Sequence, residues 1–388
     1  MISSKRTGKL TSAIFSQLNL KKQELQSQGK EIIDFSIGTP DIPPAPNIIE
    51  ALAEEAKKPE NYVYAVNDTD ELINSVKKWY MRRYGVNLEK DEITSLLGSQ
   101  SGFAQLSLSL IDEGDIVLTP DPGYPIFSVG PYLAGAKIVK MPLLKENKYL
   151  VDFDKIDSET AKKAKLMVIS YPNNPTAASA PRSFYIRLVE FAKKYNILVL
   201  HDNAYSELVF DGSEGISFLS IPGAKDIGVE FNSLSKTYSI PGCRIAFALG
   251  NREVIKQLKV LKSHIDYGMF LPFQKAAVEA LEGSQDYVKF VKDTYMKRRN
   301  LLINGLCEIG WHIDSTGGSM FVWAPVPGRY TSSMEFTFAL MERTGVIVVP
   351  GISFGEHGEG FVRFALVQNE NKIRQAIENI KSSRIADE

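Results

Sequence analysis

The stretch LMVISYPNNPTAASAPRSFYIRLVEFAKKYNILVL, from Leu166 to Leu200, decides the fold class. It begins and ends with a short apolar run, and a longer amphipathic segment separates the two runs. This order is typical of a βαβ unit, whose two strands run parallel in one sheet. The chain repeats the pattern, with expected strands at Ile116–Pro120, Leu166–Tyr171, Ile197–Leu200 and Val229–Asn232. The sequence therefore predicts an α/β fold around a mostly parallel central sheet.

The order of the patterns predicts two domains. All four expected strands lie within residues 46–284, which we expect to form a large domain. Residues 285–388 contain the long helical segment KFVKDTYMKRRNLLINGL, then shorter strands and a last helix, and are expected to form a smaller α/β domain. Residues 1–45 end near the turn-rich GTPDIPPAP and are expected to lie as an arm that belongs to the small domain.

The composition excludes several classes of protein. The 388 residues include 45 basic and 46 acidic side chains spread along the chain, so we expect no nucleic-acid partner. Two cysteines, Cys243 and Cys307, are too few for a disulfide framework, and four scattered histidines have no metal-ligand spacing. We find neither a secretory signal nor a stretch apolar enough to span a bilayer. The expectation is a cytoplasmic protein without a metal or a membrane.

Two segments contain side chains that suit a bound phosphate. In SLSKTYSIPGCR, Ser233 and Ser235 flank Lys236, and Arg244 follows a Pro-Gly turn, so two hydroxyls and a guanidinium could converge on one anion. In GSQSG, at 98–102, small residues precede a helical pattern whose N-terminal N–H groups could bind an anion. Taken alone, Lys236 would be a surface lysine and the second segment a plain helix cap.

A second set of polar side chains lies at the ends of the predicted strands, where open α/β sheets bind ligands. Asp202 ends the apolar run NILVLH, and a buried carboxylate there needs a cation such as a pyridinium nitrogen, unless it caps a helix. Tyr205 and Asn174 could both reach the phenolic oxygen of such a ring, and Tyr124 could stack on its face. Singly, each of these three would more often be a turn or packing residue.

Arg363 lies in the strand-like segment FVRFAL near the end of the chain. It should point to the opposite face from its apolar neighbours Val362 and Phe364. An inward guanidinium needs an anion, which is either a substrate carboxylate held by two hydrogen bonds or the acid of a structural ion pair.

Together, the motifs GTPD, GSQSG, PDPGYP, YPNNPT, HDNAY, SLSKTY with PGCR, and VRFA resemble the class I/II aminotransferases, which are pyridoxal-phosphate (PLP) enzymes of fold type I. The resemblance implies Lys236 as the lysine that binds PLP as a Schiff base, and Asp202 on the pyridine nitrogen. It implies Asn174 and Tyr205 on the phenolic oxygen, and Tyr124 stacked on the ring. The implied phosphate ligands are Ser99, Gln100, Ser233, Ser235 and Arg244, and the implied substrate ligands are Gly38, Asn174 and Arg363.

Within this family, segments such as WYMRRYGV, HDNAYSELVFDG and KSHIDYGMF are similar to LL-diaminopimelate aminotransferases, which act in lysine biosynthesis. The likeness implies an amino acid and a 2-oxo acid, here 2-oxoglutarate, as substrates. Ser101, Ala177, Cys243 and Ala246 depart from the pattern of that group, and they leave the amino donor open between diaminopimelate and aspartate, alanine or an aromatic amino acid. A PLP-dependent C–S lyase on the same fold also stays open.

The family resemblance also implies a homodimer with shared active sites. A tyrosine from the neighbouring subunit usually reaches the phosphate in this family. The segment NYVYAVNDTDEL contains two candidates, Tyr62 and Tyr64, and has Asp68 where the family has glycine. We assign Tyr64 to this role.

Overall fold

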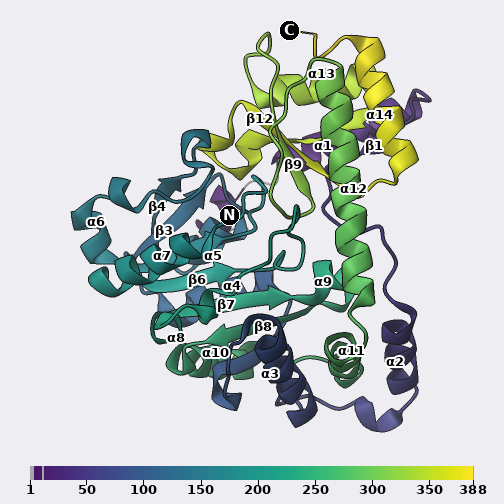
Figure 1. Ribbon diagram of the computed structural model, residues 1–388. Helices are drawn as coiled ribbons and strands as arrows, with labels where there is room; N and C mark the ends of the chain where they lie inside the picture. Colours follow the sequence, from purple (N-terminus) through teal and green to yellow (C-terminus); the bar gives the residue numbers. More distant parts are fainter. Residues whose placement is uncertain (1–3, 11–12, 388) are drawn as a thin grey trace.

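The computed structural model describes residues 4–10 and 13–387. A seven-stranded sheet lies at the centre of the larger lobe, with the strand order β2-β8-β7-β6-β5-β3-β4 (Figure 1). Its strands are β2 (Ile93–Leu97), β3 (Ile116–Asp121), β4 (Lys137–Pro142), β5 (Ala164–Ser170), β6 (Leu198–Asp202), β7 (Gly228–Ser233) and β8 (Ile245–Gly250). Only β8 runs antiparallel to its neighbours, so the sheet is mostly parallel, as predicted.

Helices cover both faces of this sheet. On β5, Leu166 and Val168 pack into one apolar cluster, with helices α4 and α10, whereas Met167 and Ile169 pack into another, with α3, α7 and α11. Alternate residues of one strand thus meet two different cores, which is why the strands are apolar throughout. The helices of this lobe are α2 (Pro46–Ala56), α3 (Asp70–Tyr84), α4 (Ser99–Leu110), α5 (Ile126–Leu133), α6 (Ser158–Lys163), α7 (Arg182–Tyr195), α8 (Ala224–Ile227), α9 (Leu234–Thr237), α10 (Arg252–Ile265) and α11 (Leu271–Glu282).

The second lobe joins the end of the chain to its beginning. The antiparallel strands β9 (Phe321–Pro325), β11 (Val349–Pro350) and β12 (Phe361–Ala365) form one sheet, and β1 (Ile33–Asp34) pairs with β10 (Val346–Ile347). Helices α1 (Ala13–Ser27), α12 (Asp286–Glu308), α13 (Ser333–Thr344) and α14 (Glu370–Ser383) complete it. Ile33 and Phe35 share a core cluster with residues between 291 and 386, and the long α12 connects the two lobes (Figure 1).

The four predicted strands are confirmed, each within two residues of its expected ends. Strands β2, β4 and β8 were not predicted. The long helix expected in KFVKDTYMKRRNLLINGL is confirmed as part of α12. The domain boundaries at residues 45 and 284 stay predictions. Within the described part of the chain, every helix is too short or too polar to cross a bilayer.

Candidate active site

A cavity of about 580 Å³ opens where the two lobes meet, at the carboxyl ends of β5, β6 and β7. Every predicted site residue except Tyr64 lines it. These residues are Gly38, Ser99, Gln100, Tyr124, Asn174, Asp202, Tyr205, Ser233, Ser235, Lys236, Arg244 and Arg363. They are separated by up to 325 positions in the chain, from 38 to 363, so the fold has brought the whole predicted set together.

Lys236 lies in the short helix α9, directly after β7. Its ammonium donates a hydrogen bond of 2.6 Å to the backbone oxygen of Gly38, across the boundary between the lobes. Burial, together with the positive charges of Arg363 and Arg244, lowers the pKa of Lys236 to about 8. A lysine that loses its proton this readily can act as a nucleophile or a general base.

Asp202 is the last residue of β6 and lines the cavity while only 8% exposed. Its Oδ1 atom has no hydrogen-bond partner among the described residues. Burial raises the pKa of this carboxyl to about 6, although the charge of His201 and the N–H of Ala204 act in the other direction. Residues 204–207 form a turn rather than a helix, so Asp202 is not a helix cap. A cationic N–H from a ligand would satisfy this carboxylate.

The predicted anion-binding groups line the cavity, and Arg244 lies against the turn before Ser99. Ser99 begins α4, and the preceding Gly98 has φ 84°, a conformation that side chains other than glycine rarely adopt. A Cβ atom on Gly98 would overlap the guanidinium of Arg244, so glycine is required for the close approach of this arginine. Ser233 and Ser235 line the same cavity after β7.

Tyr205 and Tyr124 also line the cavity. Burial raises the pKa of Tyr205, and the negative charge of Asp202 adds to this effect. Burial also raises the pKa of Tyr124, whose hydroxyl donates a hydrogen bond of 3.1 Å to Gln100 Oε1. Both phenols are therefore neutral hydrogen-bond donors near neutral pH.

Arg363 lies on β12, with its apolar neighbours Val362 and Phe364 in the core of the small lobe, as predicted. Its Nη1 donates to Asn174 Oδ1 at 2.9 Å and its Nη2 to the backbone oxygen of Ser36 at 2.8 Å. The guanidinium has five N–H donors, and its Nε has no partner, so donors are left for an anion. No acid pairs with Arg363 among the described residues.

Two aromatic rings enclose this guanidinium. Its Cζ atom lies 4.3 Å from the ring centre of Phe321 and 4.8 Å from that of Phe354. Burial lowers the pKa of Arg363 to about 10. Sequence reasoning missed both phenylalanines, because each is an ordinary core residue in its local pattern and only the fold places it against Arg363.

Tyr64 lies outside the cavity, with 81% of its surface exposed. Its ring centre is 5.1 Å from that of Tyr267, and its hydroxyl has no hydrogen bond among the described residues. The other candidate, Tyr62, donates its hydroxyl to the backbone oxygen of Ala56 at 2.8 Å. Of the two phenols, Tyr64 is the one left available to a second chain, and its role stays a prediction.

Ala177, which stands where the family pattern has glycine, is fully buried and adopts φ 58°. The loop after Asn174 therefore keeps a left-handed conformation at this position although the residue has a side chain.

Comparison with known proteins agrees with these features. The chain matches the family model of aminotransferase class I and II over residues 30–380. It is 42% identical to the LL-diaminopimelate aminotransferase of Halothermothrix orenii over 374 residues, and this alignment covers 96% of each chain. It is 39% identical to the glutamate-pyruvate aminotransferase AlaC of Escherichia coli, over 98% of this chain and 94% of that one.

A solved structure, substrate-bound BacF from Bacillus subtilis, is 35% identical and superposes with a TM-score of 0.95 over 98% of both chains. The predicted architecture, that of fold type I aminotransferases, is confirmed. The chain therefore belongs to the aminotransferase class I and II family.

Proposed function

We propose that this aminotransferase uses PLP to move the amino group of LL-diaminopimelate to 2-oxoglutarate, a step of lysine biosynthesis. The observation that carries the cofactor assignment is the convergence of Lys236, Asp202 and Arg363 on one cavity. The substrate assignment rests on the relatives at about 40% identity over nearly the whole chain, including the enzyme of Halothermothrix orenii. The cytoplasmic location stays a prediction.

The residues around the cavity fit PLP. The buried Asp202 has an oxygen without a partner, which suits a protonated ring nitrogen. The phosphate would be held by Ser99, Gln100, Ser233, Ser235 and Arg244, and glycine at position 98 leaves room for the arginine. Tyr124 would lie against the ring, and Asn174 and Tyr205 would donate to its phenolic oxygen. The side chains are of the types that each part of the cofactor needs.

When bound, PLP supplies an electron sink for the bonding electrons released at the substrate α-carbon. Lys236 would hold the cofactor through Nζ, and the same nitrogen would accept the α-proton of the substrate as a general base. Its depressed pKa keeps Nζ unprotonated for this task in a larger fraction of molecules. Arg363 holds the α-carboxylate with N–H groups that the protein leaves unused, and so orients the α-proton toward Lys236.

A second candidate donor is an amino acid with an apolar side chain. Among the described residues that line the cavity, the charged ones are Asp202, Lys236, Arg244 and Arg363. All four have roles toward the cofactor or the α-carboxylate, whereas Phe15, Ile37 and Ile126 line other parts of the cavity. Diaminopimelate carries a second ammonium and a second carboxylate. The described lining of this chain has no further charged side chain to pair with either group. An aromatic or aliphatic donor has no distal charge and needs no such partner.

A homodimer with shared active sites would supply partners for the distal ammonium and carboxylate of diaminopimelate. In our proposal, Tyr64 of one subunit reaches the phosphate in the other, and polar groups from the same subunit meet the distal end of the substrate. The exposure of Tyr64, its unused hydroxyl, and its exposed neighbours Val63 and Val66 support this assembly.

Steady-state kinetics over a panel of donors test the proposal. With 2-oxoglutarate as acceptor, LL-diaminopimelate should exceed alanine, aspartate and phenylalanine in kcat/KM by about 10²-fold or more, because a site built to pair two charged groups rejects donors that lack them. Comparable values would reject diaminopimelate as the specific donor, and a preference for phenylalanine would favour the apolar candidate. Turnover without any 2-oxo acid would instead indicate a lyase.

A further inference from the structure

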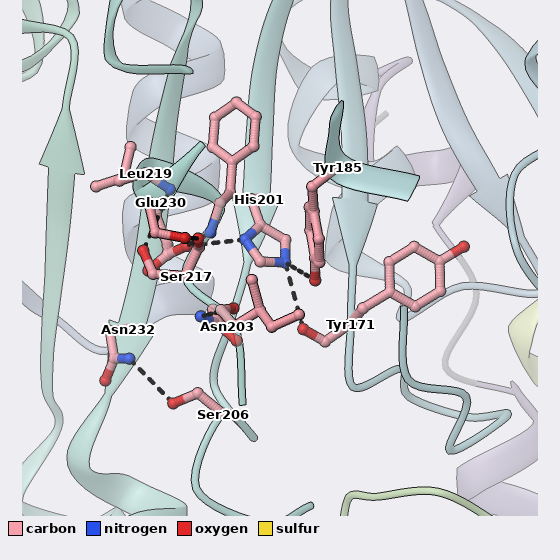
Figure 2. A network of polar contacts seen from close by, with 12 residues as sticks. Tyr171, Tyr185, His201, Asn203, Ser206, Ser217, Leu219, Glu230 and Asn232 are labelled. Carbon is pink, nitrogen blue, oxygen red and sulfur yellow. Dashed lines mark hydrogen bonds and ion pairs between the residues drawn. The ribbon is translucent and has the colours of Figure 1, made fainter. Parts of the chain in front are cut away.

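A buried polar network joins Glu230, His201, Ser217 and Tyr185 (Figure 2). Its centre is His201 on β6 and Glu230 on β7, which are direct neighbours in the register of these strands. Both side chains are fully buried, with 0% exposure. Because side chains alternate along a strand, Asp202 points toward the cavity while His201 points away from it. None of the proposed catalytic steps uses this network.

Hydrogen-bond donors surround the carboxyl group of Glu230. Its Oε1 accepts hydrogen bonds of 2.9 Å from the hydroxyls of Tyr80 and Ser217. Its Oε2 accepts one of 2.7 Å from the N–H of Phe218 and faces His201 Nδ1 at 3.0 Å (Figure 2). Three donors and His201 Nδ1 thus surround the two oxygens, an arrangement that suits a carboxylate, which accepts hydrogen bonds only.

Among the described residues that contact Glu230, His201 alone can carry a positive charge, because the other partners are two hydroxyls and a backbone N–H. Its Nε2 lies 3.3 Å from the backbone oxygen of Tyr171, which can only accept, and 3.4 Å from the hydroxyl of Tyr185. An imidazole that faces a carboxylate on one nitrogen and a carbonyl on the other can donate to both only when it is protonated. A buried carboxylate without a cation is strongly unfavourable, and an imidazolium at position 201 would supply that cation.

The pair also connects the elements that carry the active site. Tyr171 follows β5 and leads into the loop of Asn174, while His201 immediately precedes Asp202. Tyr80 comes from α3, and the hydrogen bonds of Ser217 and Phe218 anchor the segment before α8. The ends of β5, β6 and β7 are thus held together beneath the cavity.

We propose that His201 and Glu230 are positioning residues, a buried imidazolium–carboxylate pair that holds Asp202 in place and keeps its carboxyl ionised toward the ring nitrogen of the cofactor. This inference rests on the proposed cofactor binding. His201, the positive member of the proposed pair, directly precedes Asp202 in the chain, so its charge favours the ionised form of the Asp202 carboxyl group. The direction in which His201 shifts the pKa of Asp202 agrees with this arrangement.

The pH dependence of this region involves few other groups. On the network side, the titratable neighbours are Tyr80 and Tyr84 of α3, Tyr171 after β5 and Tyr185 of α7. Burial raises the pKa of all four phenols, so they stay neutral near neutral pH. On the cavity side, Tyr205 and Tyr124 interact with Asp202, and both are also neutral. Lys236, whose pKa is lowered to about 8, also changes charge in the upper part of this range, so the acidic part of the pH profile is the part that reports on Asp202.

The first experiment measures the charge of His201 in the full-length chain after removal of the cofactor, by ¹⁵N NMR of the imidazole nitrogens. Only four histidines are present, and His201→Gln identifies the signal. We expect both ring nitrogens of His201 to carry protons up to pH 8 in the wild type. In Glu230→Gln, one of the two nitrogens should be unprotonated at the same pH. A neutral ring at pH 7 in the wild type would overturn the proposal, whether or not the protein binds PLP.

The second experiment measures PLP affinity by absorbance titration between pH 5 and 8, as a ratio to the wild type at each pH. In His201→Gln and Glu230→Gln, the acidic midpoint of binding should rise by about one pH unit, a roughly tenfold loss of affinity near pH 6. The double variant should lose no more than either single one, because the two residues act as one unit. Tyr185→Phe, which removes a neighbouring hydroxyl and no charge, should keep the wild-type midpoint.

The outcomes separate this inference from the proposed function. Variants that unfold at lower temperature but keep the wild-type midpoint would make the pair merely structural and overturn the inference. A wild type that binds no PLP at any pH would instead reject the cofactor assignment, and the NMR result would still decide the charge of the pair.

Discussion

Replacing Arg363 by lysine is the sharpest test of the proposed carboxylate site. Lysine keeps the positive charge but not the planar fork, and a single ammonium replaces a guanidinium that already donates to Asn174 and Ser36. We expect the loss of one charge-assisted hydrogen bond to the substrate, about 1.5–3 kcal/mol, which raises KM roughly 10- to 150-fold. The aromatic rings of Phe321 and Phe354 also lose the flat group that lies between them.

The assay is steady-state kinetics with several amino donors and with the 2-oxo acid, since every substrate carries the same α-carboxylate. KM should rise for all of them, with kcat changing less, because the bond is made in the bound state as well as in the transition state. The matched control is Arg298→Lys. Arg298 is equally buried and binds Asp41 through two hydrogen bonds of 2.6 and 2.8 Å, but it does not line the cavity. An Arg363→Lys variant whose KM values equal those of the control would refute the reasoning and leave Arg363 as a structural residue.

The remaining predictions concern the cofactor site. Lys236→Ala should still bind PLP but lose turnover, and in the wild type borohydride should fix the cofactor on Lys236; peptide mapping to another lysine would contradict the assignment. Asp202→Ala should lower kcat by roughly 10²- to 10³-fold and Asp202→Glu by less, as measured by single-turnover rates, whereas a nearly unchanged rate would make this carboxylate dispensable. Because burial raises the pKa of Asp202 from 3.8 to about 6, the folded chain binds more protons than the unfolded chain between these values, so stability without cofactor falls as pH rises through this window. Asp202→Asn should remove that fall in thermal unfolding of cofactor-free protein between pH 4 and 8, and an identical pH profile would argue against the raised pKa. Gly98→Ala should displace Arg244 and weaken PLP binding about tenfold or more, while Gly85→Ala, at φ 65° with open space around the added Cβ, should cost some stability without changing PLP affinity.

Much of this protein could be predicted from its sequence, because the deciding signals are local. The alternation of apolar runs with amphipathic segments predicted the α/β class, and the polar residues that end those runs marked one edge of the sheet. Parallel strands present their carboxyl ends on the same side, so Asn174, Asp202 and Ser233 were bound to meet. The motif order indicated the family, which the comparisons confirmed. Strand β8, the apolar run IAFALG, has the same local pattern as the predicted strands and was missed, and its antiparallel pairing with β2 and β7 is a property of the tertiary structure alone.

Only the tertiary structure decided which distant side chains meet and how deeply they are buried. Nothing in the local pattern of Phe321 or Phe354 indicates that they enclose Arg363, and nothing near Glu230 in the chain indicates that it pairs with His201. Burial, rather than residue type, lowers the pKa of Lys236 and raises that of Asp202. The physical reason is that the cost of removing a charge from water depends on everything packed around it, and those neighbours come from segments hundreds of residues apart.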